Sequence, residues 1–149
     1  MKPVFCYNDI NITNLVYQSG NDRVIFLDYE WAGFSSVAYE IGYHLASVHS
    51  GTAKDLTGLM PTDSYVREWV SKYLRKKAQI TGSGEMVSEY AISKLVHEVD
   101  VLMPITVFLV ALICIRLASL PEKEDKLGFD YIGNGAARFD YYFKSKKEP

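Results

Sequence analysis

The sequence has few features of a metal, redox or nucleic-acid-binding protein. It contains only two cysteines, Cys6 and Cys114, without a CxxC motif or a cysteine–histidine spacing. We therefore expect both to be reduced and structural. An excess of basic residues is also missing, because 16 lysines and arginines face 18 acidic residues for a net charge of −2. We accordingly expect no nucleic-acid partner.

Long apolar segments are scarce as well. The residues after Met1 turn polar by Asn8 and Asp9, so we expect no signal peptide and a cytoplasmic location. The longest uncharged stretch, 101–115, is shorter than the roughly 20 residues of a membrane-spanning helix. This length favours a buried helix and no membrane insertion.

The composition indicates a chain that buries one core. Hydrophobic residues make up 48% and aromatic residues 13% of the 149 positions, and the sequence shows no repeat or linker. We therefore expect a single domain over 1–149. The oligomeric state stays open, with a homo-oligomer among the possibilities.

Local patterns predict a few strands followed by helices. Short β-branched and aromatic runs, with turn residues at 18–22, predict strands over 4–7, 15–17 and 24–27, the last two forming a hairpin. A first helix is expected over 37–49, and a second begins after a cap at Thr62 or Asp63. The segment 85–115 is expected to form one or two helices, with a kink or junction at Pro104. A last helix is expected near 133–146, after a charged loop at 121–126. This order predicts an α+β class with a mainly helical body.

Three polar residues have the order of parts found in kinase active sites. Asp9 is followed five residues later by Asn14, then by the hairpin and Asp28. Antiparallel pairing returns Asp28 to the end of the hairpin where Asn14 lies. We therefore expect the three side chains to converge at one edge of a cleft.

Phosphoryl transfer needs these residue types. A carboxylate orients the attacking hydroxyl and accepts its proton, which suits Asp9, while oxygen ligands hold Mg²⁺, which suits Asn14 and Asp28. The D-x4-N spacing alone arises often by chance. Asp9 and Asn14 would equally serve as turn formers, and Asp28 as a cap.

Longer segments carry a family resemblance. VFCYNDINITNLVY and VIFLDYEWAGFSSVAYEIGYHLAS resemble the choline/ethanolamine kinase family, whose pattern is H-N-D-x4-N and then I-D-[YF]-E-[YW]. The resemblance continues to FDYIGNGAARFDYYFKSKK and covers nearly the whole chain. It implies the C-terminal lobe of a protein kinase-like fold with a small β-hairpin beside the catalytic loop. It also implies phosphorylation of a small amino alcohol, ethanolamine or choline, with ATP and Mg²⁺ as cofactors.

The resemblance assigns roles to four residues. Asp9 matches the catalytic base, Asn14 and Asp28 match the Mg²⁺ ligands, and Glu30 matches a carboxylate near the metals. The sequence leaves the choice between ethanolamine and choline open.

Several positions depart from the family pattern. Tyr7 stands where the family has a histidine that supports the loop, and Glu40 replaces an aspartate that steadies it. Tyr43 replaces an asparagine of the family. Ser47 stands near the position at which the family has an acidic residue on the substrate side. We expect Tyr7 to preserve much of the supporting role.

The substrate side departs further. The family has a W-x-x-W pair in an aromatic box for the ammonium group, whereas this sequence has Val110 and Ile113 there and no tryptophan after Trp69. A quaternary ammonium would lose much of its cage. Tyr131 and nearby aromatic residues are candidate replacements, and they are equally candidates for the core.

The front half of a kinase has no counterpart in the sequence. None of its ten glycines forms a GxGxxG phosphate loop, and the strand lysine that positions ATP has no match. We therefore expect a fragment or a shortened product that lacks kinase activity alone. The alternative to an enzyme domain is a non-catalytic remnant or a binding partner of a full-length kinase subunit.

Overall fold

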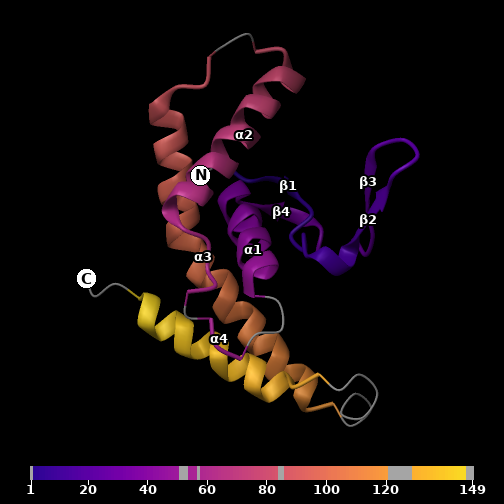
Figure 1. Ribbon diagram of the computed structural model, residues 1–149, viewed down its shortest axis with the longest axis vertical. Coiled ribbons are helices and arrows are strands. Elements are labelled where there is room, and N and C mark those ends of the chain that lie inside the picture. The colour runs from indigo at the N-terminus through magenta and orange to yellow at the C-terminus, as the bar shows by residue number, and fades with distance from the viewer. Residues whose placement is uncertain (1, 51–53, 57, 84–85, 121–128, 147–149) are drawn as a thin grey trace.

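The computed structural model describes residues 2–50, 54–56, 58–83, 86–120 and 129–146. Its elements in chain order are β1 Val4–Cys6, the 3-10 turn η1 Ile12–Asn14, β2 Leu15–Gln18, β3 Arg23–Phe26, β4 Gly33–Ser35, α1 Val37–Ser50, α2 Asp63–Thr81, α3 Glu89–Ala118 and α4 Tyr131–Ser145. The predicted α+β class with a mainly helical body is confirmed (Figure 1).

The strands form two antiparallel pairs. β2 and β3 make the predicted hairpin, with Leu15 opposite Phe26 and Gln18 opposite Arg23. β1 pairs with β4, a strand that the sequence did not predict because its pairing partner lies about 30 residues earlier in the chain. The hairpin projects away from the helices, and β1–β4 lies beside α1 (Figure 1).

Caps define the ends of the helices. The Thr62 hydroxyl accepts a hydrogen bond from the Tyr65 N–H at 3.3 Å, as the predicted N-cap of α2 should, and Gly82 ends that helix at φ 63°. The last helix begins at Tyr131, because the Asp130 side chain accepts from the Gly133 N–H at 2.8 Å. The expected loop at 121–126 lies outside the described residues.

α3 is one continuous helix, so Pro104 marks no junction between two helices. A proline inside a helix costs about 3 kcal/mol. Packing of α3 against α1, α2 and α4 offsets that cost. The Thr106 hydroxyl donates to the Met103 carbonyl at 2.7 Å just after the proline.

The core lies where α1, α2 and α3 meet. Its buried side chains include Leu45 of α1, Val66 of α2 and Val99 of α3. Gly42 brings α1 close to α3, since a Cβ there would lie 3.1 Å from the Met103 Cα. α1 is therefore fixed against α3, and this placement orients the site described below.

α3 is buried on one face only. Val101, Ile105, Leu109 and Leu112 follow one another at helical spacing and are each at least 38% exposed. By length and composition the helix could cross a membrane, and 28% of its most apolar window is buried. The expectation of a buried helix over 101–115 thus holds for the face toward α1 and α4.

Candidate active site

Asp9 and Asn14 are in direct contact. The Asn14 amide donates to Oδ2 of Asp9 at 2.6 Å, and the Asn11 amide donates to Oδ1 at 2.9 Å. The Asn11 side chain also accepts from the Thr13 N–H at 3.0 Å and so caps η1, the short turn that brings Asn14 back toward Asp9. The predicted pairing of these two residues is therefore present.

Asp28 lies at the end of the hairpin nearest this pair. The Leu27 N–H donates to the Asn14 carbonyl at 2.9 Å, and the Tyr7 hydroxyl donates to the Leu27 carbonyl. Burial raises the pKa of Tyr7, and the negative charges of Asp9 and Asp28 raise it further. The convergence of the Asp28 side chain with Asp9 and Asn14 stays a prediction.

Two non-glycine residues at this site have left-handed backbone conformations. Asn8 has φ 65° and Asp28 has φ 58°. Asparagine and aspartate tolerate this region better than other residues with a Cβ, and such conformations gather at functional sites. The Asn8 side chain donates to the Trp31 carbonyl at 3.1 Å and ties its turn to the segment after Asp28.

Glu30 is not joined to the other predicted residues. It is exposed in the turn in which the Ala32 N–H donates to the Tyr29 carbonyl at 3.0 Å. Its assignment as a carboxylate near the metals stays a prediction.

One face of α1 holds the loop that carries Asp9. Glu40, Tyr43, His44 and Ser47 are spaced at three, four and seven residues, which places them on one side of the helix. Oε2 of Glu40 accepts from the Tyr7 N–H at 2.5 Å and from the Asn8 N–H at 2.9 Å, so Glu40 does steady the loop.

The rest of this face reaches the next two loop residues. The Tyr43 hydroxyl donates to Oδ1 of Asp9 at 2.5 Å. Nδ1 of His44 lies 3.0 Å from the Ile10 carbonyl, and the Ser47 hydroxyl donates to that carbonyl at 3.3 Å. Burial raises the pKa of Tyr43, as do its hydrogen bond to Asp9 and the charge there, so its phenol stays a donor.

Tyr7 supports the loop as expected. Its ring makes edge-on contacts with Phe26 and Tyr29, each with centroids 5.2 Å apart. Together with the hydrogen bond to Leu27, these contacts fasten the loop to the end of the hairpin. A tyrosine therefore fills the position in which the family has histidine.

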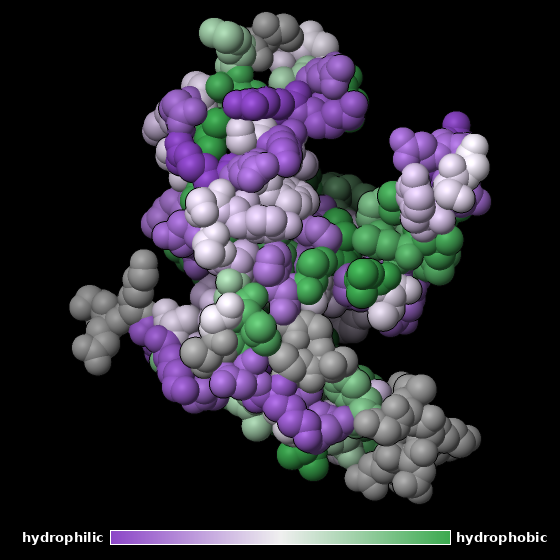
Figure 2. Space-filling model, in the orientation of Figure 1, coloured by the Kyte–Doolittle hydropathy of each residue, from purple (hydrophilic) through white to green (hydrophobic). Residues whose placement is uncertain are grey.

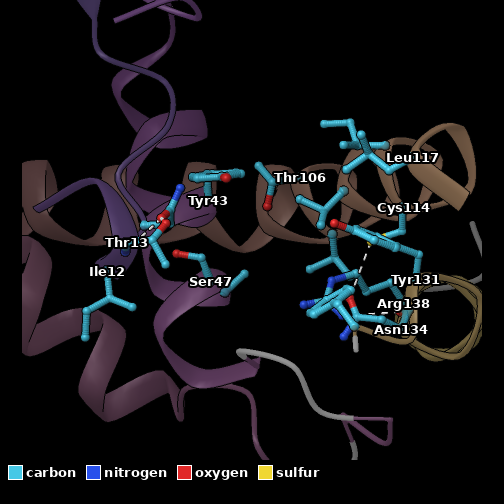
Figure 3. A pocket seen from close by; sticks show the side chains of 16 residues that line it. Ile12, Thr13, Tyr43, Ser47, Thr106, Cys114, Leu117, Tyr131, Asn134 and Arg138 are labelled. Carbon is cyan, nitrogen blue, oxygen red and sulfur yellow. Dashed lines mark hydrogen bonds between the residues drawn. The ribbon is translucent and has the colours of Figure 1, made fainter. Parts of the chain in front are cut away.

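A pocket of about 450 Å³ opens beside the loop, between α1, α3 and α4 (Figure 3). It contains both predicted cage positions, Val110 and Ile113, and also Tyr131. Its other lining residues are Asn11, Ile12, Thr13, Tyr43, Ala46, Ser47, Thr106, Val107, Cys114, Leu117, Phe129, Asn134 and Arg138. Of the α4 residues, the sequence indicated Tyr131 but not Asn134 or Arg138, although the similarity of segment 129–147 to the family pointed to this helix.

The α4 side of the pocket is polar and buried. Arg138 is 5% exposed and donates from Nη1 to the Asn134 carbonyl at 3.3 Å. The Cys114 thiol donates to Oδ1 of Asn134 at 3.4 Å. Burial lowers the pKa of Arg138, but a guanidinium keeps its charge at neutral pH.

The surface beside the site is apolar. Phe5 and Phe34 form an edge-on pair with centroids 5.9 Å apart, and they are 67% and 80% exposed. Ile12, Tyr29 and Trp31 are more than half exposed. Apolar side chains gather near the base of the hairpin in Figure 2. Loop 7–14 therefore lies next to a broad uncovered apolar face.

The donors near Asp9 suit Mg²⁺. The Asn14 amide donates through its nitrogen, which leaves its oxygen for a ligand role, and Asp28 supplies a carboxylate. No group of three or more histidine, cysteine or acidic side chains is found within the described ranges. Mg²⁺ often takes only one or two carboxylates and completes its shell with phosphates and water, so this small donor set fits it.

Comparisons with known proteins place this chain among small-molecule kinases by similarity. The chain is 30% identical over 145 residues to ethanolamine kinase 1 of Mus musculus, covering 97% of this chain and 39% of the mouse protein. It is 28% identical over 147 residues to probable choline kinase 3 of Arabidopsis thaliana, covering 95% of this chain and 40% of the plant protein. The chain thus spans about two fifths of the length of these relatives.

The fold also matches a solved structure. An ethanolamine kinase of Plasmodium vivax aligns with a TM-score of 0.74 at 21% identity, covering 95% of this chain and 34% of that one. The predicted kinase-like fold is therefore confirmed. The family model for choline/ethanolamine kinase matches residues 2–143, and the chain accordingly belongs to the choline/ethanolamine kinase family.

Proposed function

We propose that this chain supplies the base and the metal ligands of an ATP-dependent kinase that phosphorylates the hydroxyl of a small alcohol of the ethanolamine and choline class. The contact between Asp9 and Asn14 carries the proposal, because it joins the expected base to an expected metal ligand at 2.6 Å. Asp28, the other expected metal ligand, follows Leu27, whose N–H donates a hydrogen bond to the Asn14 carbonyl.

Asp9 would orient the substrate hydroxyl and accept its proton. Oδ2 is occupied by Asn14, whereas Oδ1 accepts from Asn11 and Tyr43, which both line the pocket. A substrate hydroxyl entering from the pocket would therefore replace one of these donors at Oδ1. The hydroxyl oxygen then forms the new bond to the γ-phosphorus while the bond to ADP breaks.

Asn14 and Asp28 would hold Mg²⁺, and Glu30 is the nearest further carboxylate along the chain. When bound, the metal neutralises charge on the ATP phosphates. The protein's own part is to keep these oxygens beside Asp9. The Glu40 and Tyr7 contacts fix the start of the loop, and the hydrogen bond from the Leu27 N–H to the Asn14 carbonyl fixes its end.

A second candidate is a non-catalytic role as partner of a full-length kinase subunit. The observation that favours it is the exposed pair of Phe5 and Phe34, since a partner lobe would cover such a face. A chain that only binds would keep this surface but would not depend on Asp9.

A chimera tests the proposal. The part of mouse ethanolamine kinase 1 that precedes the matched region is fused upstream of this chain, and ADP formation is measured with ethanolamine and choline. We expect alcohol-dependent turnover that falls at least about 1,000-fold in Asp9→Asn, since base and positioning are lost together. Asp22→Asn, at the far hairpin turn, is the control and should keep full activity. Turnover unaffected by Asp9→Asn would refute the assignment.

A further inference from the structure

The outer face of α3 carries an apolar stripe that the other helices leave open. Its side chains are Val101, Ile105, Leu109 and Leu112, which are 53%, 40%, 38% and 44% exposed. They are spaced three or four residues apart and so form one line along the helix. α1, α2 and α4 all pack against α3 (Figure 1). Together the four side chains expose roughly 300 Å², the size at which an apolar patch on a monomer is often functional.

α3 is apolar on its inner face as well. Val99, Met103 and Val107 fill the core there. The sequence has no charged residue over 101–115. A surface helix normally turns charged side chains toward water, whereas a helix that is apolar all round is normally buried. The outer stripe therefore has the composition of a surface that another molecule covers.

Opposite charges stand at the two ends of the stripe. Glu98 lies three residues before Val101, and Arg116 lies four residues after Leu112, so both continue the line of the stripe. Glu98 is partly exposed and Arg116 is exposed. Nη1 of Arg116 donates to the Ser119 hydroxyl at 3.4 Å, which leaves other guanidinium N–H groups for a carboxylate.

The order of these residues is symmetric about Val107. Glu98 lies nine residues before it and Arg116 nine residues after it. Two copies of α3 packed antiparallel, with a two-fold axis level with Val107, would therefore set Glu98 of each copy beside Arg116 of the other. Ile105 and Leu109, two residues on either side of Val107, would meet in the same way. A parallel arrangement would instead bring like charges together at both ends.

We propose that the outer stripe of α3 is the contact between two copies of this chain, packed antiparallel as a homodimer. An apolar centre with paired charges at its rim is the usual make-up of such a contact. Neither the four apolar residues of the stripe nor the two charged residues line the pocket beside Asp9. The dimer therefore leaves that pocket open, and the proposal does not depend on the proposed function.

A charge exchange tests the antiparallel arrangement. Sedimentation equilibrium of the purified chain from about 5 to 500 μM should show a monomer–dimer equilibrium with a Kd of about 100 μM or tighter. Glu98→Arg and Arg116→Glu should each weaken the dimer about tenfold, because each puts like charges together at both ends. The double variant restores opposite charges and should return the Kd to within about threefold of wild type. A double variant as weak as the single variants would overturn the arrangement.

Apolar variants locate the contact on α3. Leu109→Gln changes the centre of the stripe in both copies and should weaken the dimer at least about tenfold. Phe34→Gln changes the other exposed apolar face, beside the hairpin, and should leave the Kd unchanged. A chain that stays monomeric over the whole range, or a dimer that Phe34→Gln weakens and Leu109→Gln does not, would overturn the proposal. So would a monomer that binds phosphatidylcholine vesicles and loses this binding in Leu109→Gln, since the stripe would then contact lipid.

Discussion

The hydroxyl of Tyr43 donates a hydrogen bond to Oδ1 of Asp9 at 2.5 Å and so joins α1 to the expected catalytic base. Glu40, one turn earlier, accepts from the two N–H groups just before Asp9. The loop is therefore positioned by a helix that packs on α3 and not by the loop alone. Substitutions on this face of α1 should therefore change the position of the loop, although these residues lie far from it in the sequence.

Tyr43→Phe should destabilise the chain by about 1.5 to 3 kcal/mol, because a hydrogen bond to a charged group is lost. Urea unfolding followed by fluorescence measures the change. Tyr39→Phe is the control on the same helix and should stay within about 0.5 kcal/mol of wild type. Equal losses in both variants would show that the Asp9 contact contributes nothing specific.

Glu40→Ala should cost about 2 to 4 kcal/mol, because the N–H groups of Tyr7 and Asn8 both lose their acceptor. Glu40→Gln keeps an acceptor oxygen and should cost about 1 kcal/mol. The same unfolding assay measures both variants. Glu68→Ala, which removes an exposed ion pair to Lys72, serves as the surface control and should change little. An alanine variant as stable as wild type would rule out Glu40 as the anchor of the loop.

Alkaline pH should weaken the fold through Cys6. Burial raises the pKa of its thiol to about 11, and the charge of Glu40 adds to the effect. An unfolded cysteine ionises near pH 8.5, so between about pH 8.5 and 11 the unfolded chain releases a proton that the folded chain keeps. This contribution to the free energy of unfolding is present below about pH 8.5 and is lost as pH rises toward 11. In Cys6→Ala the decline measured by urea unfolding from pH 8 to 11 should be shallower than in wild type, and parallel curves would disprove the link.

The loop and the hairpin could be predicted because their signals are local. The spacing from Asp9 to Asn14 and the turn residues at 18–22 lie within short windows of the chain. Antiparallel pairing alone then places Asp28 near Asn14. β4 has no comparable signal, since its partner β1 lies about 30 residues earlier in the chain.

The pocket and the α1 contacts depend on packing between distant segments. Arg138 shares the pocket with Tyr43 only because α4 and α1 both pack against α3, which no local pattern indicates. Pro104 gave a real local signal, but the packing of α3 outweighed it and the helix stayed continuous. Tyr43 was visible as a departure from the family pattern, whereas its bond to Asp9 follows from the rotation of α1.

The chain of 149 residues alone is expected to show no measurable ATP turnover with ethanolamine or choline. Kinase catalysis depends on positioning of the phosphates and on their electrostatic stabilisation, and this sequence contains no glycine-rich phosphate loop. The site is also open to water, since Ile12, Tyr29 and Trp31 are more than half exposed around it.

A coupled assay of the purified chain measures this turnover, with Asp9→Asn as the matched variant. Without the other groups that hold ATP, Asp9 has no aligned phosphate toward which to direct a hydroxyl, and Mg²⁺ lacks the phosphate ligands on which it relies. We therefore expect wild type and Asp9→Asn to give the same background rate. A robust rate that disappears in Asp9→Asn would mean that these residues suffice to align the nucleotide, which would contradict the prediction.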